Sequence, residues 1–328
     1  MKYPKSLKPN SLIGITAPSA GIKEEEYELF ERSLQRLKDN DWNIVETKNV
    51  RSEDDVSSPA KQRAEEFLNL WKDDKVDAIL CARGGDFLTD MLPYLEDQKL
   101  KGNCKWVMGA SDPTNLLYYI TTSEDIATLY GHNAGSFDSM HLNKSQEIAL
   151  EYLKGNLVVQ ESYDKYEKEK GHRENEDYHL TEQVEWKTNQ DFDVEGRIIG
   201  GCLDCLRYLP GTKWDKTKEF VEKYKEDGII WYFDIFNMSA EDVYLTLFEL
   251  KHAGWFEHVK GIIVGRVLFP STYTSMTYER AFYETFAEIP VIIDADIGHV
   301  VPKMTIINGC IAHITAKNKK GRIEQFLK

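Results

Sequence analysis

The sequence lacks several features that define common classes of protein. Its 328 residues include no apolar run near the roughly 20 residues that a membrane-spanning helix needs. Its five cysteines are scattered and odd in number, which does not indicate a disulfide framework and favours a reducing compartment. Positive charge near the N-terminus is not followed by the apolar stretch of a signal peptide. We therefore expect a cytoplasmic protein that does not associate with membranes.

Basic residues are also in the minority, with 41 Lys and Arg against 55 Asp and Glu, for a formal net charge of −14. A strongly negative protein repels nucleic acid and anionic lipid surfaces, so we expect neither as a partner. The glycine patterns G-x-G-x-x-G and G-x-x-x-x-G-K-[ST], which mark nucleotide-binding loops, are missing as well. The length predicts a globular protein of about two domains, and the charge says little about small substrates.

The first half of the chain alternates strand-like and helix-like segments. Apolar runs typical of strands cover residues 11–17, 42–47, 76–82 and 106–110. Apolar residues at helical spacing cover 24–39, 58–71, 87–95 and 113–121. This alternation predicts an α/β domain in which helices cover both faces of a parallel sheet.

The domain boundaries follow from a change in composition. Charged residues crowd together over 163–177 with almost no large aliphatic side chains, which predicts a solvated linker or surface loop, or alternatively a lid over the site. We expect a first domain over 1–160, a charged linker over 161–193 and a second domain over 194–328.

Three apolar runs end in residue types that hydrolases use, in the order Ser111, Asp234 and His299. A side chain just past the carboxyl end of a buried strand lies where open α/β sheets bind their ligands. Serine, carboxylate and histidine together there would form a hydrolase triad, which geometry defines rather than sequence order. The alternative for the first of them is that Ser111 and Asp112 only cap the helix that follows.

Paired glycines follow the third strand-like run, in Arg83-Gly84-Gly85-Asp86. Glycines at such a point let backbone N–H groups approach a ligand. We expect the amides of Gly85 and Asp112 to form an oxyanion hole, although a plain strand-to-helix turn is an alternative interpretation. Arg83 and Gly84 complete this part of the predicted substrate site, and His132, which follows another strand end, is a further candidate for its wall.

Cys202-Leu203-Asp204-Cys205 is a single C-x-x-C motif. Zinc takes four ligands, and no nearby pair of histidines completes the set. We interpret the two cysteines as small residues that pack at a helix start, and we expect neither a metal nor a cofactor.

Several strings spread over nearly the whole chain are together typical of one family. They are Thr16-Ala17-Pro18-Ser19, Ala82-Arg83-Gly84-Gly85, Gly109-Ala110-Ser111-Asp112-Pro113-Thr114, Gly200-Gly201-Cys202-Leu203, Leu209-Pro210-Gly211-Thr212 and Gly298-His299-Val300-Val301-Pro302-Lys303. In these strings the chain resembles the serine peptidase family of LD-carboxypeptidases, peptidase family S66, which also holds the microcin C self-immunity proteins.

The resemblance implies an N-terminal flavodoxin-like domain that carries the nucleophile and a C-terminal β-rich swivelling α/β domain that carries the acid and base. It also implies a metal-free homodimer, with Ser111 as nucleophile and His299 as base. Two positions depart from the family. The acid is normally a glutamate, where this chain has Asp234, and Gly131-His132-Asn133 stands where a His-Gly-Pro string is more frequent.

Together these features predict a serine carboxypeptidase-type amidase, an LD-carboxypeptidase that releases the terminal D-alanine of murein tetrapeptides during murein recycling. One alternative is a microcin C-type immunity peptidase that cleaves aminoacyl-nucleotide amides, with Trp186 stacking on the nucleobase. The other alternative is a catalytically weak binding homologue in which Asp234 does not support the histidine.

Overall fold

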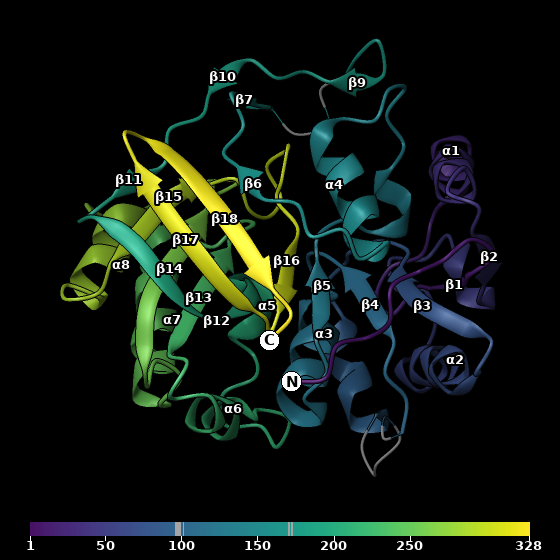
Figure 1. The fold of residues 1–328 in the computed structure, drawn as a ribbon, viewed down its shortest axis with the longest axis horizontal. Coiled ribbons are helices and arrows are strands. Elements are labelled where there is room, and N and C mark those ends of the chain that lie inside the picture. Colours follow the sequence, from purple (N-terminus) through teal and green to yellow (C-terminus); the bar gives the residue numbers. More distant parts are fainter. Residues whose placement is uncertain (96–99, 101, 170, 172) are drawn as a thin grey trace.

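The computed structural model describes residues 1–95, 100, 102–169, 171 and 173–328, and it contains two large sheets that lie side by side (Figure 1). The first sheet has the strand order β2-β1-β3-β4-β5, all parallel, with β16 antiparallel on the outer side of β5. Its strands are β1 (Leu12–Thr16), β2 (Asn43–Glu46), β3 (Val76–Cys81), β4 (Trp106–Gly109), β5 (Thr128–Tyr130) and β16 (Ile306–Asn308). The parallel order is that of flavodoxin-like domains, which confirms the expected fold of this part of the chain.

The helices around the first sheet follow the predicted alternation. They are α1 (Tyr27–Lys38), α2 (Ala60–Lys72), α3 (Thr114–Glu124) and α4 (Lys144–Leu153), with short 3-10 helices η1 (Glu24–Glu26), η2 (Lys48–Val50), η3 (Leu88–Tyr94) and η4 (Ala134–Ser136). The helix expected over 87–95 is a 3-10 helix that contains Pro93. Proline removes an N–H donor and disfavours the interior of an α-helix, which accounts for the difference.

The second sheet is larger and mixed, with the order β11-β15-β14-β13-β12-β17-β18-β6. Strands β12 to β15 are parallel to one another, and the flanking strands are antiparallel. Its strands are β6 (Gln160–Glu161), β11 (Lys187–Thr188), β12 (Phe192–Cys202), β13 (Ile229–Asp234), β14 (Val259–Gly265), β15 (Val291–Ala295), β17 (Ile311–Lys317) and β18 (Lys320–Phe326). The helices of this half are α5 (Leu203–Leu206), α6 (Thr217–Lys223), α7 (Ala240–His252) and α8 (Tyr278–Thr285).

The two halves exchange strands, which the predicted boundaries do not include. The C-terminal part supplies β16 to the first sheet, where the buried Ile306 and Ile307 cover the open edge of β5. In the other direction, β6 at the end of the first part pairs with β18 of the second sheet. Covering an edge strand satisfies its exposed hydrogen-bonding groups, which gives a physical reason for the exchange.

The segment predicted as a linker over 161–193 is partly ordered. Its described residues include four further two-residue strands besides β11, namely β7 (Lys165–Tyr166), β8 (Arg173–Glu174), β9 (Asp177–Tyr178) and β10 (Glu182–Gln183). Lys170 and His172 lie outside the described residues. Figure 1 shows that the segment with β7, β9 and β10 runs across the end of the molecule above α4 and β6.

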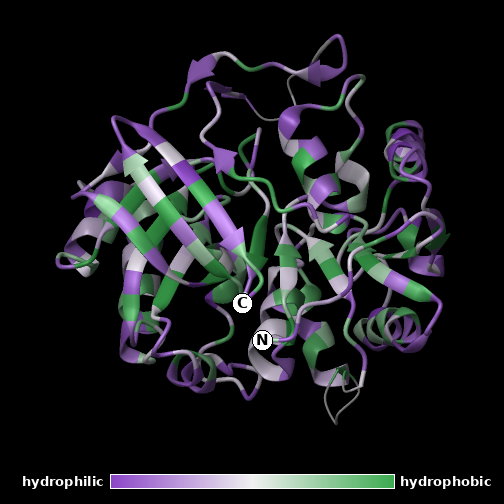
Figure 2. Ribbon diagram, viewed as in Figure 1, coloured by the Kyte–Doolittle hydropathy of each residue, from purple (hydrophilic) through white to green (hydrophobic). Residues whose placement is uncertain are grey.

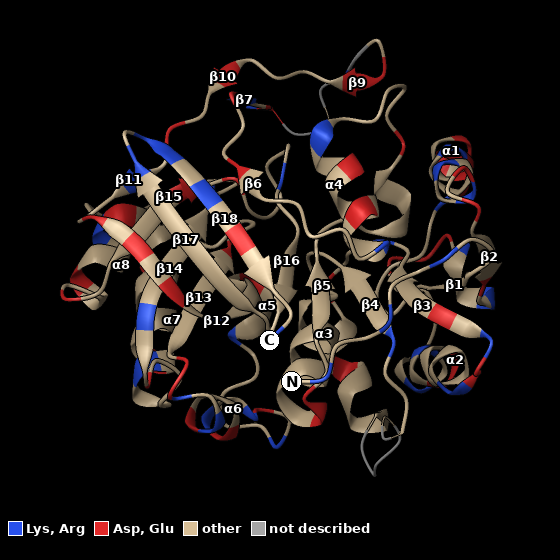
Figure 3. Ribbon diagram, viewed as in Figure 1, with Lys and Arg blue, Asp and Glu red and all other residues tan. Residues whose placement is uncertain are grey.

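Hydrophobic residues are concentrated in the central strands, and the outward faces of helices such as α1 are hydrophilic (Figure 2). Charged residues lie on the outer helices and on β18, whereas β4 and β5 carry none (Figure 3). In the part of the chain that the structure describes, no helix has the length and apolar character required to cross a membrane.

Candidate active site

Ser111 lies in the sharp turn between β4 and α3. Its φ is +68°, in the left-handed region that a serine rarely adopts, so the backbone is strained at this point. A Cβ on Gly84 would lie 3.0 Å from Ser111 Oγ. The hydroxyl is therefore held at a strand-to-helix turn against backbone that carries no side chain.

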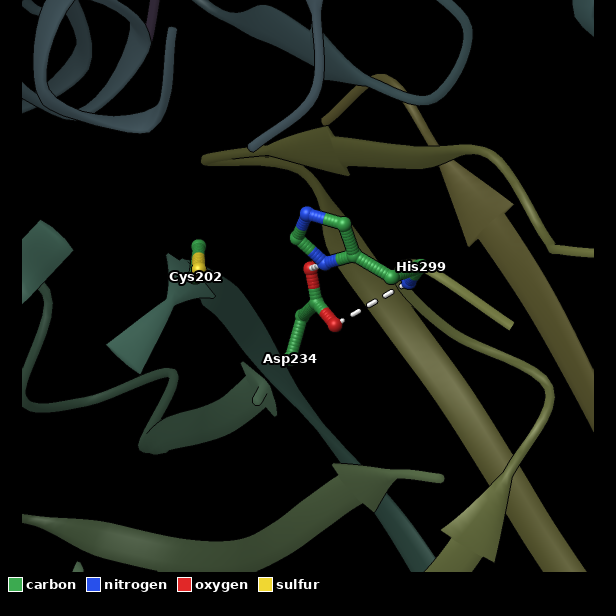
Figure 4. A group of neighbouring side chains, drawn as sticks. All are labelled: Cys202, Asp234 and His299. Atoms are coloured by element: carbon green, nitrogen blue, oxygen red, sulfur yellow. Dashed lines mark hydrogen bonds and ion pairs between the residues drawn. The ribbon is translucent and has the colours of Figure 1, made fainter. Parts of the chain in front are cut away.

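His299 and Asp234 complete a continuous chain of polar contacts with this hydroxyl. Nε2 of His299 is 2.9 Å from Ser111 Oγ, and Nδ1 is 2.6 Å from Asp234 Oδ2. The backbone N–H of His299 also donates to Asp234 Oδ1 at 3.1 Å (Figure 4). The structure thus brings together three side chains that are 123 and 65 residues apart in sequence.

Asp234 is fully buried at the end of β13. Burial alone would raise the pKa of its carboxyl, but the neighbouring His299 and the hydrogen bond from Tyr130 favour the charged form and hold that pKa below the ordinary value. The residue is therefore a carboxylate at neutral pH, placed against the imidazole nitrogen that faces away from Ser111.

Gly298 determines how closely the histidine loop approaches this carboxylate. Its φ is +101°, and a Cβ at this position would clash with Asp234 Oδ1. Both observations require glycine here, because other residues rarely adopt this conformation and because the space is occupied.

Tyr130 is a part of the site that the sequence did not indicate. Its fully buried hydroxyl donates to Asp234 Oδ2 at 2.6 Å and accepts the backbone N–H of Ser111 at 3.2 Å. One phenol therefore connects the carboxylate of the second sheet with the strained serine of the first. The neighbouring Asn133, rather than the predicted His132, bonds through its side chain to both backbone groups of Ala110.

Several residues predicted for the substrate site lie near Ser111. Gly84 and Gly85 border the same cavity as Ser111, and Arg83 borders it while forming an ion pair with Glu26. The carboxylate of Asp112 is buried and accepts hydrogen bonds from the Ser19 hydroxyl and from the backbone N–H of Leu88. Burial raises the pKa of Asp112 above its ordinary value.

The structure does not bring His132 and Trp186 into the site. The ring of His132 is completely buried and packs against Phe137, and burial holds its pKa well below the ordinary value, so it is a neutral core residue. Trp186 is also buried, and its indole N–H donates to Asp296. Stacking on a nucleobase needs an exposed ring face, which this tryptophan does not have, so the predicted role of Trp186 is corrected.

Two cavities meet at Ser111 and His299. The smaller, of about 250 Å³, is lined in part by the charged side chains of Asp138, Glu167, Arg173 and Lys303. The larger, of about 980 Å³, is lined in part by the aromatic side chains of Phe87, Tyr208 and Phe236. The segment predicted as a linker or lid contributes Glu167, Gly171, Arg173 and Tyr178 to the smaller cavity.

Among the residues that the structure describes, one group of potential metal ligands lies inside the site. A ligand atom from each of Cys202, Asp234 and His299 lies within 4.8 Å of the others. The sequence did not indicate this group, because the histidine follows the cysteine by 97 residues.

The fold and the site define a hydrolase of a two-domain peptidase class, and comparison with known proteins identifies the family. The family model of the LD-carboxypeptidase N-terminal domain matches residues 13–131, and that of the C-terminal domain matches residues 195–314. The chain belongs to this peptidase family, S66.

Relatives of known sequence or structure are similar over nearly the full length. "Putative carboxypeptidase YocD" of Bacillus subtilis is 28% identical, over 98% of each chain. The microcin C7 self-immunity protein MccF of Escherichia coli is 27% identical, over 96% of this chain and 94% of its own. Its structure in complex with aspartyl sulfamoyl adenosine has a TM-score of 0.82 at 24% identity, covering 99% of both chains. An MccF-like protein from Bacillus anthracis has a TM-score of 0.85 at 23% identity, covering 100% of both.

Proposed function

We propose that the protein is a serine amidase of carboxypeptidase type, with Ser111 as nucleophile, His299 as general base and Asp234 as the acid of the triad. The observation that carries the proposal is the unbroken contact chain from Ser111 Oγ through the imidazole to a buried carboxylate. In such a chain the carboxylate fixes the imidazole tautomer and stabilises the imidazolium that forms during the reaction.

The proposed reaction uses this geometry. His299 Nε2 takes the hydroxyl proton as Ser111 Oγ attacks the amide carbonyl, and the backbone amides of Gly85 and Asp112 stabilise the oxyanion. The imidazolium then donates its proton to the leaving amine, which departs and leaves an acyl ester on Ser111. A water molecule, deprotonated by the same imidazole, hydrolyses that ester and restores the serine.

We infer that the substrate is a murein tetrapeptide and that the terminal D-alanine is released. The smaller cavity suits a single amino acid, and Lys303 in its lining provides positive charge for the free carboxylate. The larger cavity has room for the remaining tripeptide on the other side of Ser111. In this assignment the product that leaves first occupies the smaller cavity.

A second candidate is an aminoacyl-nucleotide amide of the type bound by MccF. The observation that favours it is the aromatic lining of the larger cavity, because rings such as Phe87 and Tyr208, both more than half exposed, can stack on a nucleobase. Here the amino acid in the smaller cavity is the acyl group, and the nucleotide amine leaves first.

The test is incubation with a murein tetrapeptide and, separately, with aspartyl sulfamoyl adenosine, both in water enriched in ¹⁸O. Mass spectrometry of the products identifies the cleaved bond, and the label marks the acyl fragment. We expect ¹⁸O in the tripeptide and unlabelled D-alanine, with no turnover by Ser111→Ala or His299→Ala. Labelled aspartate would establish the second candidate instead. Binding without turnover of either compound, or full activity of Ser111→Ala, would refute the serine amidase.

A further inference from the structure

Cys202 is held beside the catalytic carboxylate by the second sheet. It is the last residue of β12, and in the parallel register of β12 and β13 it pairs with Asp234. Its side chain is buried, and Sγ lies within 4.8 Å of a carboxylate oxygen of Asp234 and of a ring nitrogen of His299 (Figure 4). The sequence argued against zinc because no nearby pair of histidines completes the ligands of the C-x-x-C motif, but the fold places one histidine, His299, close to Cys202.

The surroundings of the two thiols are rich in negative charge. Cys202 Sγ is 3.6 Å from Asp204 Oδ2, and Cys205 Sγ is 3.9 Å from Asp112 Oδ1. A divalent cation would offset this concentration of acidic groups and stabilise the thiolate.

We propose that Cys202, Asp234 and His299 form an inhibitory binding site for a thiophilic divalent cation of the Zn²⁺ type. Sulfur, imidazole nitrogen and carboxylate oxygen are the ligand types that Zn²⁺ takes in proteins. On binding, the Cys202 thiol loses its proton to solvent and the thiolate bonds to the metal.

The metal stops catalysis at whichever ring nitrogen it binds. On Nε2 it occupies the lone pair that would accept the proton of Ser111. On Nδ1 it displaces the proton that points at Asp234, and the neutral imidazole then carries its proton on Nε2, where it cannot act as a base. The same carboxylate that orients His299 for catalysis becomes a ligand, so a bound metal and an active triad exclude each other.

The experiment measures binding and inhibition separately. Isothermal titration with Zn²⁺, and Cd²⁺ binding followed by thiolate-to-metal charge-transfer absorption, are carried out on the wild type, Cys202→Ser and Cys104→Ser. Cys104 is an exposed cysteine and serves as the control for binding to any thiol. Circular dichroism verifies folding, and Cys202→Ala replaces the serine variant if that variant does not fold.

We expect one Zn²⁺ per chain in the wild type and Cys104→Ser, with a charge-transfer band that Cys202→Ser lacks. Loss of the thiolate should weaken Zn²⁺ binding by at least the roughly 10–100-fold that loss of an outer-shell partner costs. Equal affinity of Cys202→Ser and wild type would overturn the site, as would loss of binding in Cys104→Ser.

The inhibition arm rests on the proposed function. Turnover with and without Zn²⁺ is compared within each variant, so that a change in basal turnover cancels from the ratio. We expect saturating Zn²⁺ to suppress turnover in the wild type and to have a much smaller effect in Cys202→Ser. If neither substrate is hydrolysed, the proposed function fails, while titration of the metal still tests the site. Binding without inhibition would overturn the inhibitory role.

Discussion

Asp234 is one methylene shorter than the glutamate that the family normally carries, and the surrounding residues fit closely around the shorter side chain. One carboxylate oxygen accepts the backbone N–H of His299, and the other lies against both the imidazole and the hydroxyl of Tyr130. Gly298 leaves no space beside the first oxygen. Contacts with several neighbouring residues therefore fix the position of the aspartate carboxylate.

Restoring the glutamate should reduce activity. The added methylene in Asp234→Glu moves the carboxylate by about 1 Å toward Gly298 or Tyr130, and a misplacement of that size can lower the rate roughly a hundredfold. Asp234→Asn should lower kcat further, through the wrong imidazole tautomer. Steady-state kinetics of the two variants test this expectation, and a glutamate variant faster than the wild type would contradict it.

We expect Tyr130 to position the proposed nucleophile and the proposed acid. In Tyr130→Phe the carboxylate loses one hydrogen bond and the Ser111 N–H loses its acceptor, so kcat should fall about 10–100-fold while KM changes little. The pKa of Asp234 should rise, because a hydrogen bond to its charged form is lost. Tyr152→Phe is the matched control, since that buried hydroxyl bonds to Gln160 and Gln325 away from the site. Equal kinetics for both variants would argue against the role.

The lowered pKa of Asp234 has a consequence for stability. The folded protein binds the carboxyl proton less readily than the unfolded chain does, so this group stabilises the fold above its ordinary pKa of 3.8. That contribution is lost as the pH falls through the lower pKa of the folded state. The difference in unfolding free energy between the wild type and Asp234→Asn should therefore narrow below about pH 4. Urea unfolding of both proteins from pH 6 to pH 3 measures it, and a difference that widens toward low pH would contradict the expectation.

Several residues of the site could be predicted because the sequence pattern indicates where a buried strand ends. Ser111, Asp234 and His299 each follow an apolar run, and parallel strands bring such ends to one edge. Tyr130 could not be found in this way, since its importance lies in a hydroxyl that reaches two other elements. Trp186 was misassigned because an aromatic residue near a predicted boundary looks exposed in sequence, whereas Gly321 leaves space for its ring in the core.

Among the elements, β16 is one that joins the two sheets. Asn308 at its end is fully buried, and its Oδ1 accepts hydrogen bonds from the Gly200 N–H at 3.2 Å and the Tyr232 hydroxyl at 2.9 Å. A three-residue strand thereby connects β5 of the first sheet with β12 and β13 of the second. Its length explains why the sequence pattern did not reveal it.

Replacing this asparagine should destabilise the fold. Asn308→Ala leaves a buried N–H and a buried hydroxyl without their acceptor, and each such loss costs about 1–3 kcal/mol. Asn69→Ala, on the exposed face of α2, is the control and should have little effect. Chemical denaturation measures the free energy of unfolding of both variants. Equal values would show that the contacts of Asn308 in β16 do not stabilise the fold.

The charged segment after α4 shows the limits of composition at the level of elements. Its many charges correctly indicated solvent contact, but composition does not show that Glu167, Arg173 and Tyr178 border a cavity at Ser111. Those positions are set by pairing between distant residues, such as the contact of Arg173 with Asp138. Order in this segment depends on its partners more than on its own sequence.

At the scale of the whole molecule, the exchange of β6 and β16 makes the two halves interdependent. A fragment of residues 1–156 would lack the strand that covers β5 and should not fold to a native state. The complete chain should unfold in one transition, with coincident curves from far-ultraviolet circular dichroism and tryptophan fluorescence. Two separate transitions, or a cooperatively folded fragment, would show that the halves are independent.

Length and alternation predicted the two-part organisation and the parallel sheet of the first part. They did not predict that the parts share strands, because β16 is short and is separated from β5 by 175 residues of sequence. A local sequence pattern indicates which elements form. Which strand pairs with an edge strand depends instead on which apolar surface the rest of the fold leaves uncovered.

The contact between Ser111 Oγ and His299 Nε2 crosses the boundary between the two sheets. The distance between these two atoms therefore depends on the relative position of the two sheets as well as on the local packing of the two side chains. A substitution at this boundary, even one far from the bound substrate, would shift Ser111 relative to His299. It would therefore change kcat as a substitution in the active site does. In a random mutagenesis screen, variants with slow turnover but unchanged cavity residues should therefore carry substitutions at the boundary between the two sheets.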